Sequence, residues 1–151
     1  MNSNLHLLLP GPGWHQALRD LTRRHGTLVA LDETHTHVAG PGGATAMWHL
    51  DPDVVTIVKA VAGGLPMGAY GVTAELGEQL DAARNIATGG TLSGNPLSAA
   101  AAKAALTQVL VPAYAPTTAL GRQLADGIDQ AIKAAGLPWT VIRLGPRSGQ
   151  W

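Results

Sequence analysis

Several features that mark common classes of protein are missing from this sequence of 151 residues. It has no cysteine, which excludes disulfides and thiolate metal sites. The absence is compatible with a reducing compartment, so we expect a cytoplasmic protein. Ten basic residues balance ten acidic ones, and they form no basic stripe. The sequence therefore predicts neither a nucleic-acid partner nor an acidic membrane surface as a partner.

Long apolar runs are also missing. The leucine-rich stretch at residues 5–9 is too short to span a membrane, and it lacks the basic flank of a signal peptide. The composition is nevertheless 46% apolar. A chain of this length with balanced charge is typical of a globular domain with a core of its own.

Motifs of several enzyme classes are absent as well. Ser93 does not lie in a G-x-S-x-G turn, because two residues separate it from Gly90, so a serine hydrolase is unsupported. The glycines form neither a P-loop nor a G-x-G-x-x-G fingerprint. Asp32, His35 and His37 could supply oxygen and imidazole ligands. No HExxH-like helical pair supports that reading, and we predict no metal site.

Lys59 is the most informative residue that is present. It is the only charged residue between positions 54 and 71, a run of valines, alanines and glycines. We expect this setting to desolvate the amine, which disfavours its charged form. Because a free amine attacks carbonyls, Lys59 is a candidate for a Schiff base with an aldehyde cofactor.

A carboxylate that could act on such a cofactor ends the preceding strand pattern. Residues 27–32 are an apolar run that closes on Asp32, as in a buried parallel strand. Ligands of open α/β sheets bind at the carboxyl ends of the strands, which favours a cofactor role for Asp32. A strand-terminal aspartate can equally cap the following turn, and the pattern alone leaves both interpretations open.

The order of elements predicts an α/β fold. A strand, a helix and a strand at the N-terminus would form a βαβ unit, and residues 33–50 have no regular pattern. The expected strands cover residues 5–9, 27–32, 54–58, 69–73 and 139–144. The expected helices cover residues 14–25, residues 97–110 after an Asn95 cap and before Pro112, and a last stretch that Thr117 or Thr118 caps and Gly136 ends.

Four segments of the chain carry a resemblance to a known family. They are residues 31–36, 40–43, 52–71 and 90–96. In this order and at these separations they resemble the class III aminotransferases, which use pyridoxal phosphate (PLP) and include glutamate-1-semialdehyde aminomutases and β-amino-acid transaminases. The resemblance covers nearly the whole chain.

The resemblance implies a fragment of the fold type I large domain, a mostly parallel sheet with helices, followed by the start of the small C-terminal domain. Residues 1–111 would belong to the PLP-binding large domain. Residues 112–151 would form the connecting helix and the start of the small domain. The proline-rich stretch at residues 111–116 is the expected boundary.

The resemblance also implies roles for single residues. Lys59 would form the Schiff base with PLP and move the substrate proton, and Asp32 would pair with the pyridinium nitrogen. Thr34 would lie against the cofactor ring, and His35 near the substrate. Thr91 would reach the cofactor phosphate across the interface of a homodimer; judged without the resemblance, it is an ordinary loop threonine.

The implied function is that of a PLP-dependent transaminase, which moves an amino group between an amino acid and a keto acid or aldehyde. Two alternatives remain: an isomerase of the glutamate-1-semialdehyde 2,1-aminomutase type, and a non-catalytic remnant or interaction module. The phosphate-binding loop and the ring-stacking aromatic residue that relatives carry upstream are not found here. We therefore expect a truncated copy that captures PLP weakly, leaves apolar surface uncovered and does not turn over.

Overall fold

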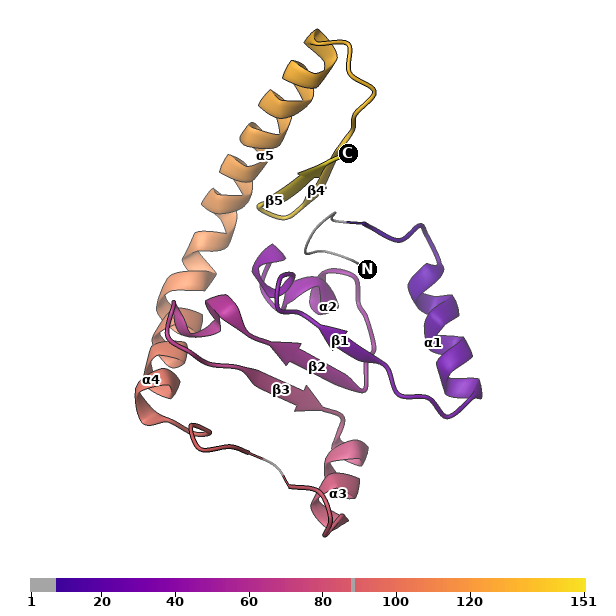
Figure 1. Cartoon of the computed structure of the whole chain (residues 1–151), viewed down its shortest axis with the longest axis vertical. Coiled ribbons are helices and arrows are strands. Elements are labelled where there is room, and N and C mark those ends of the chain that lie inside the picture. Colours follow the sequence, from indigo (N-terminus) through magenta and orange to yellow (C-terminus); the bar gives the residue numbers. More distant parts are fainter. Residues whose placement is uncertain (1–7, 88) are drawn as a thin grey trace.

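A small mixed sheet forms the centre of the molecule. The computed structural model describes residues 8–87 and 89–151 (Figure 1). The strands lie in the order β1 (Ala30–Asp32), β2 (Val54–Ile57) and β3 (Ala69–Val72). β1 and β2 are parallel, whereas β2 and β3 are antiparallel. The predicted α/β class agrees with this arrangement, but the sheet of the described residues is mixed rather than mostly parallel.

Helices surround this sheet, with α1 beside the β1 edge and the long α5 rising on the other side of the molecule (Figure 1). The α-helices are α1 (Trp14–Arg24), α2 (Gly43–Met47), α3 (Ala74–Ala82), α4 (Pro96–Ala104) and α5 (Leu110–Ala134). The shorter turns are the 3-10 helices η1 (His37–Ala39) and η2 (Lys59–Ala62) and the π-helix η3 (Ala105–Val109). None of the described helices is long and apolar enough to cross a membrane.

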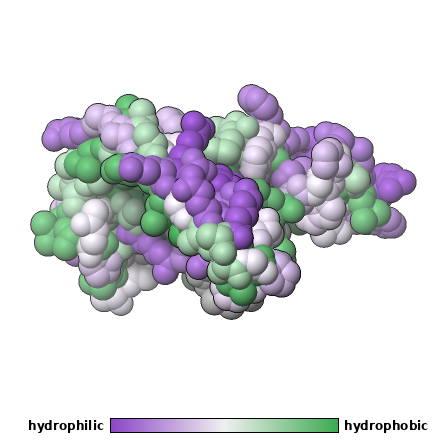
Figure 2. Space-filling view, turned by 90° about the horizontal axis from the view of Figure 1, so that it is seen from above, coloured by the Kyte–Doolittle hydropathy of each residue, from purple (hydrophilic) through white to green (hydrophobic). Residues whose placement is uncertain are grey.

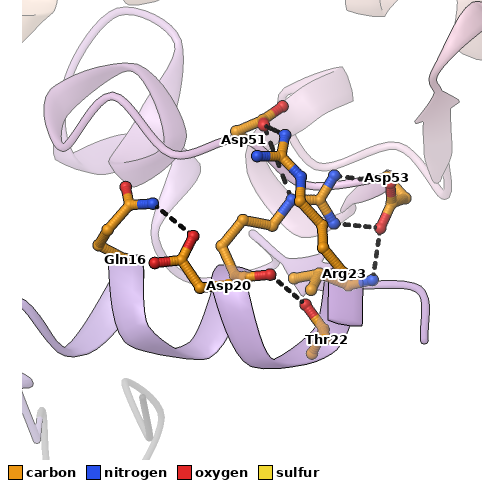
Figure 3. A network of polar contacts seen from close by, with 8 residues as sticks. Gln16, Asp20, Thr22, Arg23, Asp51 and Asp53 are labelled. Carbon is orange, nitrogen blue, oxygen red and sulfur yellow. Dashed lines mark hydrogen bonds and ion pairs between the residues drawn. The ribbon is translucent and has the colours of Figure 1, made fainter. Parts of the chain in front are cut away.

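A network of charges fixes α1 against the start of β2 (Figure 3). The guanidinium of Arg19 donates two hydrogen bonds to Asp53, at 2.6 and 2.8 Å. Asp53 also accepts the backbone N–H of Val29 at 2.7 Å, just before β1. Arg23 contacts Asp51 at the edge of the network. These contacts join the predicted helix at residues 14–25, which is confirmed, to two neighbouring strands.

The predicted first strand is not borne out where it can be examined. Residues 5–7 lie outside the described part of the chain, and Leu8 and Leu9 are not in a strand. The predicted strand at residues 27–32 is shortened to β1, and just before it the backbone N–H of Val29 is bound to the Asp53 side chain. The predicted βαβ unit therefore reduces, in the described residues, to α1 followed by β1.

The segment after β1 is more ordered than its sequence indicates. Residues 33–50, expected to be irregular, contain η1 and α2. The carboxylate of Glu33 accepts the N–H groups of Ala44 and Thr45, at 3.1 and 2.6 Å, in the first turn of α2. This order comes from side-chain bonds to the backbone, which a hydrophobic period does not reveal.

The predicted break between the last two helices is wrong. α4 begins at an Asn95 cap as predicted, but the chain then continues through η3 into α5, across Pro112 and Pro116. Pro112 lies in the first turn of α5, where proline is tolerated. Thr117 donates to the carbonyl of Ala113 at 2.6 Å, so its hydroxyl bonds back to the preceding turn instead of capping a new helix. The domain boundary at residue 111 stays a prediction.

The C-terminal residues form a hairpin against α5. β4 (Val141–Leu144) lies within the predicted strand and pairs antiparallel with β5 (Arg147–Gln150), which was not predicted. A buried cluster of Ala125, Ile132 and Val141 joins the hairpin to α5. Arg143 adds a 2.8 Å bond to Asp126 at the surface.

Much apolar surface remains exposed, as the sequence led us to expect. Figure 2 shows apolar side chains, in green, scattered among polar ones on the face seen from above. The most exposed large apolar side chains keep more than half of their surface in solvent: Leu92, Leu97, Leu120 and Leu124. Two of these lie on α5 and one on α4, so these helices present apolar side chains away from the described core.

The Arg19–Asp53 pair predicts a specific loss of stability in acid. Arg19 holds the pKa of Asp53 at about 2, below its ordinary value. A carboxyl group whose pKa is lowered on folding stabilises the native state. This contribution is fully present above the unfolded pKa of about 3.9, and it is lost as pH falls toward 2. We expect Asp53→Asn to cost about 2 kcal/mol of unfolding free energy at pH 6, measured by urea denaturation.

This cost should shrink as pH is lowered from about 5 to 2, because the native carboxylate is then itself protonated. Asp126→Asn is the matched control, since its pair with Arg143 is exposed and should contribute less than about 1 kcal/mol at any pH. A cost for Asp53→Asn that stays constant over this range would contradict the assignment.

Candidate active site

Asp32 lies at the carboxyl end of β1 with its side chain open to solvent. Its Oδ1 accepts the backbone N–H of Thr34 at 2.8 Å and lies 3.5 Å from the hydroxyl of Thr56 on β2. Hydrogen bonds from Thr34, from its side chain and its backbone, hold the pKa of Asp32 below the ordinary value. Asp32 thus caps the following turn, which was one of the two interpretations of the sequence. Its ionised carboxylate also stays accessible to a ligand.

Glu33, the next residue, is buried and has the opposite environment. Its carboxylate accepts hydrogen bonds from Thr36 and from both the backbone and the hydroxyl of Thr45, each of the latter at 2.6 Å. A Cβ added at Gly43 would lie 2.8 Å from Glu33 Oε2, so the close approach requires glycine. The sequence reasoning missed this role, for which the Gly42-Gly43 pair was the available signal.

Lys59 is exposed, which overturns the expectation of a desolvated amine. β2 ends at Ile57, and the chain then turns so that Val61 and Ala62 enter the core while Lys59 faces solvent. Apolar neighbours in sequence do not bury a residue in a tight turn, because successive side chains leave it in different directions. Lys59 also has a φ of 54°, in the left-handed region that non-glycine residues rarely adopt.

α4 packs against the buried side of the turn that carries Lys59. Val61 and Ala62 pack against Ala102 of α4 in one buried cluster. Ser98, also on α4, donates its hydroxyl to the carbonyl of Pro66 at 3.0 Å. The backbone around Lys59 is therefore fixed on its inner side, which can sustain a strained conformation at the outer side.

His35 lies within electrostatic range of both candidates. Burial lowers its pKa, the positive charges of Arg147 and Lys59 lower it further, and Asp32 opposes the change. Arg147 also donates from Nη1 to the His35 carbonyl at 3.0 Å. The lowered pKa favours the neutral imidazole of the half-buried His35. This side chain belongs to the same edge of the sheet as the acid and the amine.

His37 differs from His35, although it lies only two residues further along the same loop. It is 8% exposed, and its Nδ1 lies 2.7 Å from the carbonyl of Glu33. A carbonyl only accepts, so Nδ1 carries the proton in this contact. His37 is therefore a buried part of the loop.

The structure brings together only some of the residues predicted for the site. Asp32, Thr34 and His35 lie on one segment, and Lys59 follows the adjoining parallel strand. Thr91 is exposed in a turn before α4, in the segment that follows β3 and α3 (Figure 1). Thr91 was expected to act across the interface of a homodimer, so its role stays a prediction.

Asp32 and Lys59 border separate hollows. Asp32 lines a cavity of about 330 Å³ between α1 and β1, together with Glu33 and Thr36. Lys59 lines a shallower hollow with Gly64 and Met67. These two hollows share no lining residue, and no three potential metal ligands gather among residues 8–87 and 89–151.

Comparison with known proteins identifies the family. The model of the family Aminotransferase class-III matches residues 4–139. The chain belongs to the class-III aminotransferase family. It is 38% identical over 147 residues to glutamate-1-semialdehyde 2,1-aminomutase 2 of Brevibacillus brevis, covering 96% of this chain and 34% of that protein. It is 40% identical over 144 residues to glutamate-1-semialdehyde 2,1-aminomutase of Myxococcus xanthus, covering 94% and 33%.

Solved structures agree with this class-III assignment. A glutamate-1-semialdehyde-aminomutase from Pseudomonas aeruginosa, solved in complex with PMP, superposes with a TM-score of 0.87 at 34% identity, covering 95% of this chain and 34% of that one. An omega-transaminase from Sphaerobacter thermophilus gives 0.85 at 29% identity, covering 93% and 33%. The chain therefore has part of the transaminase fold, and it spans about one third of the length of these relatives.

The left-handed backbone of Lys59 predicts an unusual effect on stability. An L-residue in this conformation costs roughly 1–2 kcal/mol, which glycine avoids, although glycine loses more entropy on folding. We expect Lys59→Gly to leave the unfolding free energy unchanged or raised by up to about 1 kcal/mol in urea denaturation. Lys103→Gly, within α4, should instead lower it by about 1 kcal/mol. A loss of that size at Lys59 would argue against strain.

Proposed function

We propose that this chain carries the lysine and aspartate of a PLP-dependent transaminase and acts on amino acids and keto acids or aldehydes. The observation that supports this most is the parallel register of β1 and β2, which pairs Asp32 with Thr56. Lys59 follows Thr56 by three residues, so the acid and the amine lie at the same carboxyl edge of the sheet. Ligands of α/β sheets bind at that edge.

The residues present fit PLP. When bound, PLP supplies an aldehyde and a ring that accepts electrons. Asp32 is exposed and its lowered pKa keeps it ionised, so its carboxylate can accept a hydrogen bond from a protonated ring nitrogen. Lys59 Nζ, exposed on a fixed turn, would bind the aldehyde carbon and move a proton at the substrate Cα.

Other residues would orient the cofactor. Thr34 is fixed beside Asp32 by its N–H bond and would lie against the ring. Half-buried His35 would face the substrate. Thr91 would bind the phosphate of a cofactor held mainly by a second copy of the chain, so the proposal includes a homodimer. We also assign the protein to the cytoplasm.

The aminomutase reaction is a second candidate. Two relatives named above carry the name glutamate-1-semialdehyde 2,1-aminomutase, and they are 38% and 40% identical to this chain. The two reactions share their proton transfers and differ in whether a second substrate takes up the amino group. Incubation with an amino aldehyde alone distinguishes them, since an aminomutase exchanges the two groups on that carbon skeleton without an added keto acid, whereas a transaminase needs the keto acid as acceptor.

A non-catalytic remnant is the third candidate. The exposure of Lys59 and its separation from the Asp32 cavity favour it, because a cofactor would be poorly enclosed. Titration of the chain with PLP, followed by absorbance, separates this candidate from the other two. A remnant would show no saturable change.

The proposed role of Lys59 predicts where PLP attaches. After incubation with PLP and reduction with borohydride, peptide mapping should find the pyridoxyl group on Lys59. Lys103 and Lys133 are also exposed, but they lie on α4 and α5 and not at the carboxyl edge of the sheet. The Lys59→Arg variant should lose the label at that site. Labelling mainly at Lys103 or Lys133 would refute the assignment.

The role of Asp32 predicts an effect of charge alone. Asp32→Asn keeps an oxygen that can accept the Thr34 N–H but removes the negative charge that would hold the ring proton. We expect the Kd for PLP to rise about tenfold, equivalent to about 1.4 kcal/mol. Asp20→Asn on α1, where Asp20 bonds only to exposed Gln16, is the matched control and should bind as the native chain does. Equal affinity of both variants would remove Asp32 from the site.

A further inference from the structure

The segment that carries the candidate site is held by residues far along the chain. Arg147 of β5 donates to the His35 carbonyl at 3.0 Å, across 112 residues. Tyr114 of α5 donates to the His37 carbonyl at 3.3 Å, across 77 residues. Two carbonyls of the loop after β1 are therefore bound by side chains of the C-terminal elements.

The hairpin also packs directly on this loop. Leu144 and Ala39 form one buried cluster, with Trp48 and Ile142 against it. A Cβ added at Gly145 would lie 2.3 Å from the Ala39 carbonyl, so the two backbones nearly touch. The hairpin cannot move without moving the loop, and Arg147 is thereby presented to His35 at a fixed distance.

The charge of Arg147 is not needed for this packing. The guanidinium is half-buried, and burial lowers its pKa. Among the described residues no Asp or Glu side chain forms an ion pair with it. A half-buried charge without a carboxylate partner is costly, and an apolar side chain would hold a hairpin at lower cost. Its hydrogen bond to the site segment is the contact that distinguishes Arg147 from such a side chain.

We propose that Arg147 is a positioning residue, which fixes the segment from Asp32 to His35 in the geometry that a bound PLP ring requires. It acts through the His35 carbonyl and does not itself contact the cofactor. The inference rests on the proposed function, since it concerns the same cofactor site. It adds to that site a residue from the opposite end of the chain.

The test compares three variants of the full chain. Arg147→Met keeps much of the apolar stem and removes the donor, whereas Arg147→Lys restores a charged donor. Arg143→Met is the matched control, because Arg143 lies on the same hairpin but bonds to Asp126 on α5. Each variant is checked for folding by circular dichroism. The Kd for PLP is measured by absorbance, and the titration of the His35 imidazole is followed by NMR without cofactor.

We expect Arg147→Met to raise the Kd for PLP about tenfold and to raise the pKa of His35, because a nearby positive charge is removed. Arg147→Lys should recover at least half of the lost affinity on a logarithmic scale. Arg143→Met should stay within about twofold of the native chain. A role confined to hairpin stability would instead affect Arg143→Met and Arg147→Met alike, with no rescue by lysine.

The outcomes separate this inference from the function on which it rests. If the native chain binds PLP and Arg147→Met binds it equally well, the positioning role is wrong and the proposed function stands. If the native chain does not bind PLP at all, the proposed function fails, and the positioning role fails with it. If Arg147→Met does not fold, Arg147→Lys decides the question. A native affinity for PLP and an unchanged His35 titration would support the role. A tenfold loss of affinity in both Arg147→Lys and Arg143→Met would overturn it.

Discussion

The buried carboxylate of Glu33 is the interaction on which the candidate site depends. It accepts the first N–H groups of α2 and two threonine hydroxyls, so a buried charge is fully compensated by hydrogen bonds. Leaving a buried polar group without one of its hydrogen-bond partners costs about 1–3 kcal/mol, and more for a charged group. Two of the partners here are backbone N–H groups, which no side-chain substitution removes. Glu33 therefore folds the residues after β1 into a rigid loop.

That loop gives two adjacent acids different tasks. Successive side chains of a strand point to opposite faces, so the chain that buries Glu33 must turn Asp32 outward. Asp32 then meets Thr34 and Thr56 at the edge of the sheet, where its carboxylate stays ionised and accessible. The exposure of Asp32 thus goes together with the burial of its neighbour Glu33.

The sequence predicted the elements whose signals are local. The Asn95 cap and the helix at residues 14–25 were found because a capping side chain and an apolar face lie within a few residues. Long-range contacts carry no such signal. Nothing near Arg147 in sequence points to His35, and nothing near Pro112 shows that a π-helical turn continues the helix. The order of residues 33–50 was missed for the same reason.

The position of Lys59 matters more than its burial. The argument from apolar neighbours expected a desolvated amine, whereas the structure exposes it on a turn whose inner side is buried by α4. A turn of this kind fixes the backbone and leaves the Lys59 side chain in solvent. The left-handed φ of 54° at Lys59 is a strained conformation that accompanies this outward direction. The parallel register with β1 then places Lys59 at the same edge of the sheet as Asp32. Placement by the sheet, and not desolvation, is thus the physical basis of the proposal that Lys59 and Asp32 belong to one site.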